Sequence, residues 1–306
     1  KLLELDMVDI RADIRDKTKL KEVVETYQPE FIFHLAAQPI VSTSYSDPLE
    51  TLSTNILGTA TMLDVLKEIN YDCTAIMITS DKCYHNVEWE WGYRENDRLG
   101  GKDIYSASKA GAEIIYHAYF ESFLKNSSVK TATVRAGNVI GGGDWAKDRI
   151  VVDAVQAWAN DESVEIRSPN ATRPWQHVLE PLSGYLHLAV LLSKDNTLNG
   201  ESYNFGPKAE QNRKVVDLIT DLSNYWELKE AYRMAENANF GEANLLKLSC
   251  DKALSHLGWQ PTLSYDETVE TTSKWYFEFY KNKNVTTKDQ IEAYEKKAKE
   301  RGLPWA

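Results

Sequence analysis

Short apolar runs alternate with long amphipathic stretches through the first half of the chain. Residues 30–37 are almost continuously apolar, which is typical of a strand buried on both faces of a parallel sheet, and residues 74–79 and 130–135 are predicted as two further strands. Between these runs, residues 48–69 and 103–124 place apolar side chains near helical spacing. Strands that alternate with helices are joined by right-handed crossovers. The pattern therefore predicts an α/β fold with a doubly wound parallel sheet.

The second half is less regular and is rich in Trp and Tyr. Residues 141–144 and 167–174 carry glycine and proline signals for loops. Residues 180–194 predict a helix with proline in its first turn, and residues 203–207 predict a short strand. Further helices are predicted at 215–226, 249–257, 265–280 and 287–301, the last as a solvated surface helix. This half predicts a second, smaller α/β domain.

Composition and charge exclude several classes of protein. The 306 residues carry 46 Asp and Glu against 35 Lys and Arg, a formal charge of −11 without a basic run, which argues against nucleic-acid binding. No run of 18 apolar residues predicts a membrane span, and the first residues lack the layout of a signal peptide. Three cysteines without CxxC spacing predict neither a disulfide framework nor a metal site. We therefore expect a cytoplasmic protein that binds no membrane.

Tyr105 and Lys109 are the first candidate for chemistry. They lie four residues apart on the predicted helix 103–124 and therefore share one face of it. A nearby ammonium group favours the phenolate form of a tyrosine. Such a pair can take a proton from a sugar hydroxyl while a cofactor takes the hydride. Long helices often carry Tyr and Lys at this spacing, so a surface pair is the alternative.

A second candidate group follows the predicted strand 74–79. Ser80, Asp81 and Lys82 lie at its carboxyl end, and open parallel sheets bind ligands beyond that edge. The alternative is that Ser80 and Asp81 only cap a turn. Two independent groups that reach the same edge favour a catalytic crevice over this alternative.

Longer runs of residues resemble a known family. YSASK at 105–109 resembles the YxxxK of the extended short-chain dehydrogenase/reductase superfamily, and HLAAQ at 34–38 resembles its fourth-strand motif against the cofactor. The related dTDP-glucose dehydratases carry Asp-Glu where this chain has Asp81 and Lys82. Five runs are similar to the CDP-D-glucose 4,6-dehydratase family: HLAAQP at 34–39, SYSDP at 44–48, TSDKCY at 79–84, RAGNVIGGGDW at 135–145 and RPWQHVLEP at 173–181.

The resemblance implies a hydro-lyase that converts CDP-D-glucose to CDP-4-keto-6-deoxy-D-glucose for deoxysugar biosynthesis, as in O-antigen and lipopolysaccharide. It implies that Tyr105 takes the proton of the C4 hydroxyl, while NAD accepts the C4 hydride and later returns it to C6. Lys109 would hold the nicotinamide ribose and favour the phenolate, and Ser80 would bond the reacting oxygen. Asp81 would protonate the hydroxyl that leaves C6.

Lys82 occupies the position where relatives place a glutamate that removes the C5 proton. Two roles are open for it. Lys82 can act as a base in its neutral form, or it can stay charged and stabilise the enolate or the departing hydroxide.

The resemblance also implies binding residues. Asp13 and Ile14 would lie beside the adenine of NAD, and the cofactor-binding set is Asp13, Ile14, Leu35, Ala36, Ala37, Gln38, Thr54, Tyr105 and Lys109. Asn138 would face the sugar, and Arg149 and Arg173 are candidates for the diphosphate, with a surface salt bridge as the equal alternative for each arginine. His34 and His177 are interpreted as structural residues, and no metal site is expected.

The family organisation predicts two domains. Residues 1–138 and 175–205 would form the Rossmann domain, and residues 139–174 and 206–306 the nucleotide-sugar domain. No GxGxxG occurs near the start, and we expect the first strand, glycine loop, first helix and second strand, roughly 50 residues, to be absent from this chain. By analogy, a homodimer or homotetramer would form through helices 48–69 and 103–124.

Two other hypotheses remain. The chain could be a 4-epimerase or a dehydratase for another nucleotide-sugar, although an epimerase needs no acid and amine at Asp81 and Lys82. It could also be a non-enzymatic scaffold that keeps the fold, because the chain lacks a visible glycine loop.

Overall fold

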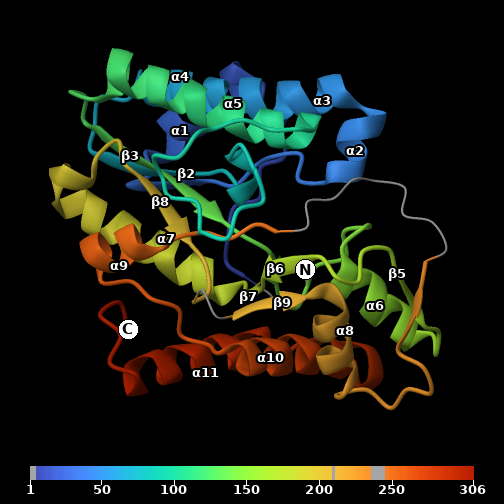
Figure 1. Ribbon diagram of the computed structural model, residues 1–306. Coiled ribbons are helices and arrows are strands. Elements are labelled where there is room, and N and C mark those ends of the chain that lie inside the picture. The colour runs from blue at the N-terminus through green and yellow to red at the C-terminus, as the bar shows by residue number, and fades with distance from the viewer. Residues whose placement is uncertain (1–4, 209–210, 236–244) are drawn as a thin grey trace. The chain divides into compact units, whose positions relative to one another are not determined.

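The computed structural model describes residues 5–208, 211–235 and 245–306. The chain divides into two compact units (Figure 1). Unit 1 holds residues 1–85, 95–135 and 185–203, and unit 2 holds residues 86–94, 136–184 and 204–306. Each unit is described by itself below.

Three neighbouring strands of unit 1 run parallel, as the apolar runs predict. They are β1 (Phe31–His34), β2 (Cys73–Ile78) and β3 (Val129–Ala136). β2 lies between the other two, with Ile76 opposite both Phe33 and Ala132. The sheet order is β1-β2-β3-β8, where β8 is Ser202–Phe205. β1 is shorter than the predicted run, because the chain leaves the sheet after His34.

The helices of unit 1 cover this sheet. α1 (Lys17–Tyr27), α3 (Pro48–Leu52), α4 (Gly58–Leu66) and α5 (Ile104–Tyr119) form a layer on one face of it (Figure 1). The short α2 (Val41–Ser46) precedes α3. Asp47 caps α3 by accepting a hydrogen bond from the Glu50 amide. The two long predicted helices are confirmed, but each contains a π-helical turn, at Ser53–Leu57 and Phe120–Leu124.

Apolar side chains pack between the helices and the sheet. Leu63 and Leu66 of α4 and Ala75 of β2 are fully buried in one cluster with Leu124 and Val129. Burial of this surface supplies most of the favourable free energy of folding. The packing fixes the face of each helix that meets the sheet.

The described residues of unit 2 combine short strands with five further helices and part of α7 (Leu179–Lys194). Its paired strands are β4 (Val139–Ile140) with β7 (Gln176–His177), β5 (Val164–Ile166) with β10 (Tyr232–Met234), and β6 (Thr172–Pro174) with β9 (Asn212–Lys214). The helices are α6 (Ile150–Ala159), α8 (Val215–Ser223), α9 (Asp251–Leu257), α10 (Tyr265–Phe277) and α11 (Thr287–Glu300).

Aromatic residues form much of the core of unit 2. Trp158, Trp226 and Trp275 belong to one buried cluster, and Trp145 packs edge-on against Trp275 with ring centroids 5.8 Å apart. The backbone at Gly142 approaches this cluster so closely that an added Cβ would lie 2.0 Å from Trp275 Cδ2. Only glycine therefore fits at position 142.

α11 is less solvated than its charged sequence predicts. Tyr294 and Ala298 are buried, and the Tyr294 hydroxyl donates to Glu180 Oε2 at 2.8 Å. Glu180, in the first turn of α7, also accepts from the amides of Thr262 and Leu263. One buried carboxyl group thus joins α7, the start of α10 and α11.

Glu180 predicts a specific dependence of stability on pH. Burial raises the pKa of Glu180 from 4.5 to about 7, although the hydrogen bonds that the carboxylate accepts lower it. The folded state therefore binds the proton more tightly, and stability from this group falls as the pH rises from 4.5 to 7, by on the order of 3 kcal/mol. Urea unfolding at several pH values should show this slope in the difference between the wild type and Glu180→Gln. A difference that stays constant with pH would contradict the prediction.

Candidate active site

α5 begins where Asp103 caps it. The Asp103 carboxylate accepts from the Ser106 amide at 2.9 Å and from the Ser106 hydroxyl at 2.7 Å. A side chain at Gly101 would collide with this first turn, because an added Cβ would lie 2.4 Å from the Ala107 amide nitrogen. The cap places Tyr105 and Lys109 on the buried face of the helix, with 7% and 5% of their surface exposed. They are not the surface pair of the alternative interpretation.

Lys109 is a buried ammonium group without an anionic partner at contact distance. No hydrogen bond or ion pair joins its Nζ to any residue in the described ranges. Burial lowers the pKa of Lys109 to about 8, although Cys83 and Glu113 act in the opposite direction. Burial and then the charge of Lys109 lower the pKa of His34 to about 4, so His34 is neutral. An ammonium group in this position costs free energy unless a ligand meets it.

Ser80, Asp81 and Lys82 follow β2 in unit 1, the unit that carries α5. Ser80 caps the short 3₁₀ turn Asp81–Cys83, since its hydroxyl accepts from the Lys82 amide at 3.2 Å and donates to Asp81 Oδ1 at 3.0 Å. Asp81 is 4% exposed. Lys82 Nζ lies 5.9 Å from the centroid of the Tyr105 ring. The turn therefore caps itself and also brings Lys82 to Tyr105.

Asn55 is a site residue that the sequence interpretation missed. Its side chain accepts from the Gln38 amide at 2.8 Å and donates to Ser108 Oγ at 2.8 Å. Ser108 in turn donates to the Tyr105 carbonyl at 2.7 Å. This buried amide joins the loop after β1 to the helix turn that carries Tyr105. One indication of this role was present in the sequence, because Asn55 is a polar residue on the apolar side of the predicted helix 48–69.

Glu113 and Arg135 were also missed as a pair. They form a buried ion pair between α5 and the end of β3, with exposed side-chain fractions of 2% and 3%. Glu113 follows Lys109 by one helical turn, and Arg135 is the first residue of the run at 135–145. Nothing in the sequence links these two positions. Their pairing is a fact of the tertiary structure.

The predicted cofactor residues lie on three segments of unit 1. Leu35 and Ala36 are exposed and Ala37 and Gln38 half-buried in the loop after β1, and Thr54 bonds Glu50 Oε1 at 3.1 Å. Arg15 bonds both oxygens of Asp13, which lowers the pKa of Asp13 to about 2. Ile14 packs against the apolar core and against Gly58.

The predicted substrate residues belong to unit 2. The Asn138 carbonyl accepts from the Gln176 amide at 3.1 Å. Arg149 forms a half-exposed ion pair with Asp144 at 3.1 Å, the surface bridge that the alternative describes. Arg173 is instead buried in β6, with 8% of its surface exposed. In the antiparallel register of the two strands it lies opposite Arg213 of β9. Burial lowers the pKa of the nearby His177 to about 4, and its Nδ1 accepts from the Leu179 amide.

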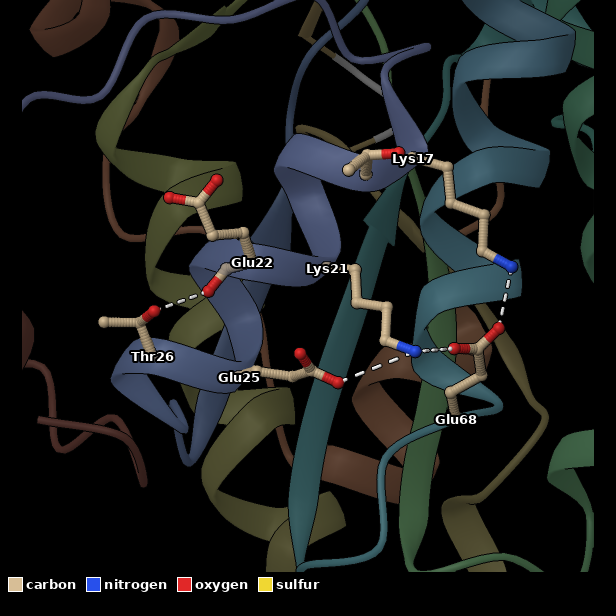
Figure 2. Close-up of a pocket in the computed structure, with 7 residues that line it drawn as sticks. Lys17, Lys21, Glu22, Glu25, Thr26 and Glu68 are labelled. Atoms are coloured by element: carbon tan, nitrogen blue, oxygen red, sulfur yellow. Dashed lines mark hydrogen bonds and ion pairs between the residues drawn. The ribbon is translucent and has the colours of Figure 1, made fainter.

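Figure 2 shows a hollow along α1 that carries no such chemistry. Glu68 accepts from Lys17 and Lys21 at 2.7 Å each, and these two bonds lower the pKa of Glu68 to about 2. These are ion pairs at the surface, where such pairs contribute little to stability. The lining residues are Lys17, Thr18, Lys21, Glu22, Glu25, Thr26 and Glu68.

Two general findings apply to the described part of the chain. None of its helices is long and apolar enough to cross a membrane. None of its clusters of His, Cys, Asp and Glu could hold a metal ion.

Known proteins share both the sequence and the fold. A family model described as GDP-mannose 4,6 dehydratase matches residues 3–272. CDP-glucose 4,6-dehydratase of Salmonella typhimurium is 42% identical, over 92% of this chain and 81% of its own length. dTDP-glucose 4,6-dehydratase of Haemophilus influenzae is 25% identical, over 87% of this chain and 81% of its own length.

Among solved structures, UDP-glucuronic acid 4-epimerase of Bacillus cereus, in complex with UDP-glucuronic acid and NAD, superposes with a TM-score of 0.77. It is 23% identical, over 89% of this chain and 82% of its own. dTDP-glucose 4,6-dehydratase of Bacillus anthracis, in complex with NAD, superposes with a TM-score of 0.74. It is 20% identical, over 88% of this chain and 79% of its own. These likenesses confirm the α/β Rossmann fold.

Proposed function

Because the chain belongs to the GDP-mannose 4,6-dehydratase family of the extended short-chain dehydrogenases/reductases, we propose that it is a hydro-lyase that converts CDP-D-glucose to CDP-4-keto-6-deoxy-D-glucose and water. The observation that carries the proposal is the buried Lys109 beside Tyr105, whose ammonium group meets no hydrogen-bonding partner in the described residues. The 42% identity to the Salmonella enzyme favours CDP-glucose as the substrate.

The residues of unit 1 fit NAD as the cofactor. Lys109 can donate to the ribose hydroxyls, and the exposed loop at Leu35 and Ala36 leaves backbone accessible beyond β1, where open sheets bind nucleotides. Asp13, Ile14, Gln38 and Thr54 would complete the contacts. When bound, NAD would supply a hydride acceptor at C4 and a hydride donor at C6. We assign the cofactor to unit 1 and the nucleotide-sugar contacts of Asn138, Arg149 and Arg173 to unit 2.

The chain's own residues then move the protons. The Tyr105 phenolate takes the proton of the C4 hydroxyl, and Lys109 stabilises the phenolate. Ser80 donates to the C4 oxygen, and the resulting ketone makes the C5 proton acidic. Asp81, which is buried, gives its proton to the hydroxyl that leaves C6. The products are the 4-keto-6-deoxy sugar and one water.

Lys82 is proposed to act in the elimination step. Its Nζ lies over the ring of Tyr105, so it is near the C4 oxygen that Tyr105 deprotonates. In its neutral form Lys82 takes the C5 proton. The ammonium group that results stabilises the enolate and gives the proton back to C5 when the hydride reaches C6. Lys82→Glu is therefore expected to lower kcat at least tenfold and to change its pH profile. Full activity with an unchanged pH profile would remove any special role for the lysine.

The direct test incubates the purified protein with NAD and CDP-glucose and follows the ultraviolet absorbance of the 4-keto sugar in alkali. A signal with CDP-glucose supports the proposal. A signal only with a dTDP-, UDP- or GDP-sugar would overturn the substrate assignment. Conversion to a 4-epimer without the keto signal would make the protein an epimerase, and no conversion of any sugar would favour a scaffold.

A second copy of the chain is proposed to bind at the helical layer of unit 1. Leu49, Leu57, Ile114 and Phe123 are 55–76% exposed on the helices 48–66 and 104–124. Exposed apolar residues on neighbouring helices are typical of a self-complementary interface. Light scattering is expected to show a dimer or tetramer, and Leu57→Asp with Ile114→Asp is expected to give monomers. A monomeric wild type would contradict this.

A further inference from the structure

The buried pair of Glu113 and Arg135 uses every hydrogen-bonding position of the carboxylate. Glu113 Oε1 accepts from Thr79 Oγ1 at 2.5 Å and from Arg135 Nε at 2.9 Å. Glu113 Oε2 accepts from Arg135 Nη2 at 2.8 Å and lies 3.0 Å from Thr133 Oγ1. The guanidinium therefore binds the carboxylate with two parallel bonds, the geometry of highest specificity. These bonds and the charge of Arg135 outweigh burial and keep the pKa of Glu113 below its usual value.

The rest of the guanidinium points to the segment after β2. Arg135 Nη1 donates to the Tyr84 hydroxyl at 2.7 Å and to the Glu95 carbonyl at 2.9 Å. The guanidinium carbon also lies 5.0 Å from the centroid of the Tyr84 ring. Thr79 directly precedes Ser80, and Tyr84 directly follows the turn Asp81–Cys83. The pair is thus bonded to both ends of the segment that carries Ser80, Asp81 and Lys82.

The same pair is fixed to the helix of Tyr105. Glu113 follows Lys109 by four residues and Tyr105 by eight, so the three side chains share one face of α5. All three are buried against the sheet. Every step of this chain of bonds lies within unit 1.

From these contacts we infer that Glu113 and Arg135 are positioning residues, which hold the Tyr105–Lys109 face of α5 in register with the Ser80–Asp81–Lys82 turn. The inference rests on the proposed function. Neither residue acts on the substrate. They act by fixing the separation between the group that takes the C4 proton and the groups that act on the C4 oxygen and the C6 hydroxyl.

A role in folding alone is the competing explanation, and physical chemistry weighs against it. A buried ion pair gains little stability over apolar residues of similar size, because desolvation offsets most of the attraction. The two parallel bonds instead give geometric specificity, and reacting groups misplaced by about 1 Å can lose 10²-fold in rate. Geometry and stability can therefore be separated by removing both charges together.

The main test is the double variant Glu113→Gln/Arg135→Met. It leaves neither partner of this ion pair as an unpaired buried charge, and the Gln amide can still accept from Thr79, so the protein is expected to fold. We expect kcat for CDP-glucose to fall about 10²-fold, with KM values for NAD and CDP-glucose within about threefold of the wild type. A folded double variant with kcat within threefold of the wild type would overturn the inference.

Tyr116→Phe is the matched control. It removes another buried bond between the same two elements, from Tyr116 of α5 to Thr131 of β3 at 3.0 Å, but it lies three turns from Tyr105. We expect it to lower the unfolding temperature and to leave kcat unchanged. Equal losses of kcat in the control and the double variant would also overturn the inference, because any weakened helix–strand contact would then suffice.

Thr79→Val covers the case in which the double variant does not fold. It keeps the shape of the side chain and removes the hydroxyl that bonds Glu113 Oε1 at 2.5 Å and the Val134 carbonyl, at the longer distance of 3.3 Å. We expect about a tenfold loss of kcat, and unchanged kcat would overturn the inference. A wild type that dehydrates no nucleotide-sugar would instead refute the proposed function, so the two failures are distinguishable.

Discussion

Tyr105→Phe is expected to lower kcat for CDP-glucose dehydration by about 10²- to 10⁴-fold, the usual contribution of a positioned acid–base group. The variant removes only the hydroxyl. The ring stays in the first turn of α5, where Asp103 caps the helix and Lys82 lies over the aromatic face. Folding and substrate KM should therefore change little, and the loss should fall on the chemical step.

Tyr119→Phe provides the comparison. Tyr119 lies on α5, as Tyr105 does, and its hydroxyl donates to Asp64 Oδ1 of α4 at 3.2 Å. No chemistry is proposed for Tyr119. Initial rates of 4-keto sugar formation for both variants decide the matter. If Tyr105→Phe keeps more than a tenth of the wild-type kcat, Tyr105 is not the group that takes the C4 proton.

Lys109→Met is expected to act in opposite directions on activity and stability. It removes a buried ammonium group that bonds none of the described residues, so the ligand-free protein should become more stable, by about 1–3 kcal/mol at pH 7. The same change removes the cation that stabilises the Tyr105 phenolate and holds the cofactor. We therefore expect kcat/KM to fall at least 10²-fold.

The pH dependence of this effect has a definite sign. The folded-state pKa of Lys109 is about 8, below its usual 10.5, so the folded protein binds this proton less tightly than the unfolded chain. The penalty is fully present below pH 8 and fades as the pH rises to 10.5. The stability gain of Lys109→Met should shrink over that window, and wild-type kcat/KM should decline above about pH 8. Cys83, Glu113 and His34 interact electrostatically with Lys109.

Lys102→Met is the control, because Lys102 is exposed just before α5. It should leave both stability and activity unchanged. Denaturant unfolding of the ligand-free protein and initial rates test the pair together. A destabilised or fully active Lys109→Met variant would contradict the interpretation of Lys109 as a ligand-binding ammonium group.

Hydrophobic periodicity predicted the long elements well. The helices at 48–69 and 103–124 and the strands at 74–79 and 130–135 were correct within a few residues, because each has a buried face that only one period satisfies. The run at 30–37 was predicted too long, since apolar character does not show where a chain leaves a sheet. α11 was predicted as a surface helix because the buried Tyr294 is a single residue among many charges.

The sequence by itself determined the fold class, the family and the candidates Tyr105, Lys109 and Ser80–Lys82, since these follow from local period and motif. The tertiary structure decided what surrounds them. The burial of Lys109, the bond network of Asn55 and the pairing of Glu113 with Arg135 join residues 17 to 53 positions apart. Such contacts depend on how helices pack on a sheet, and no local pattern of hydrophobic and polar residues encodes them.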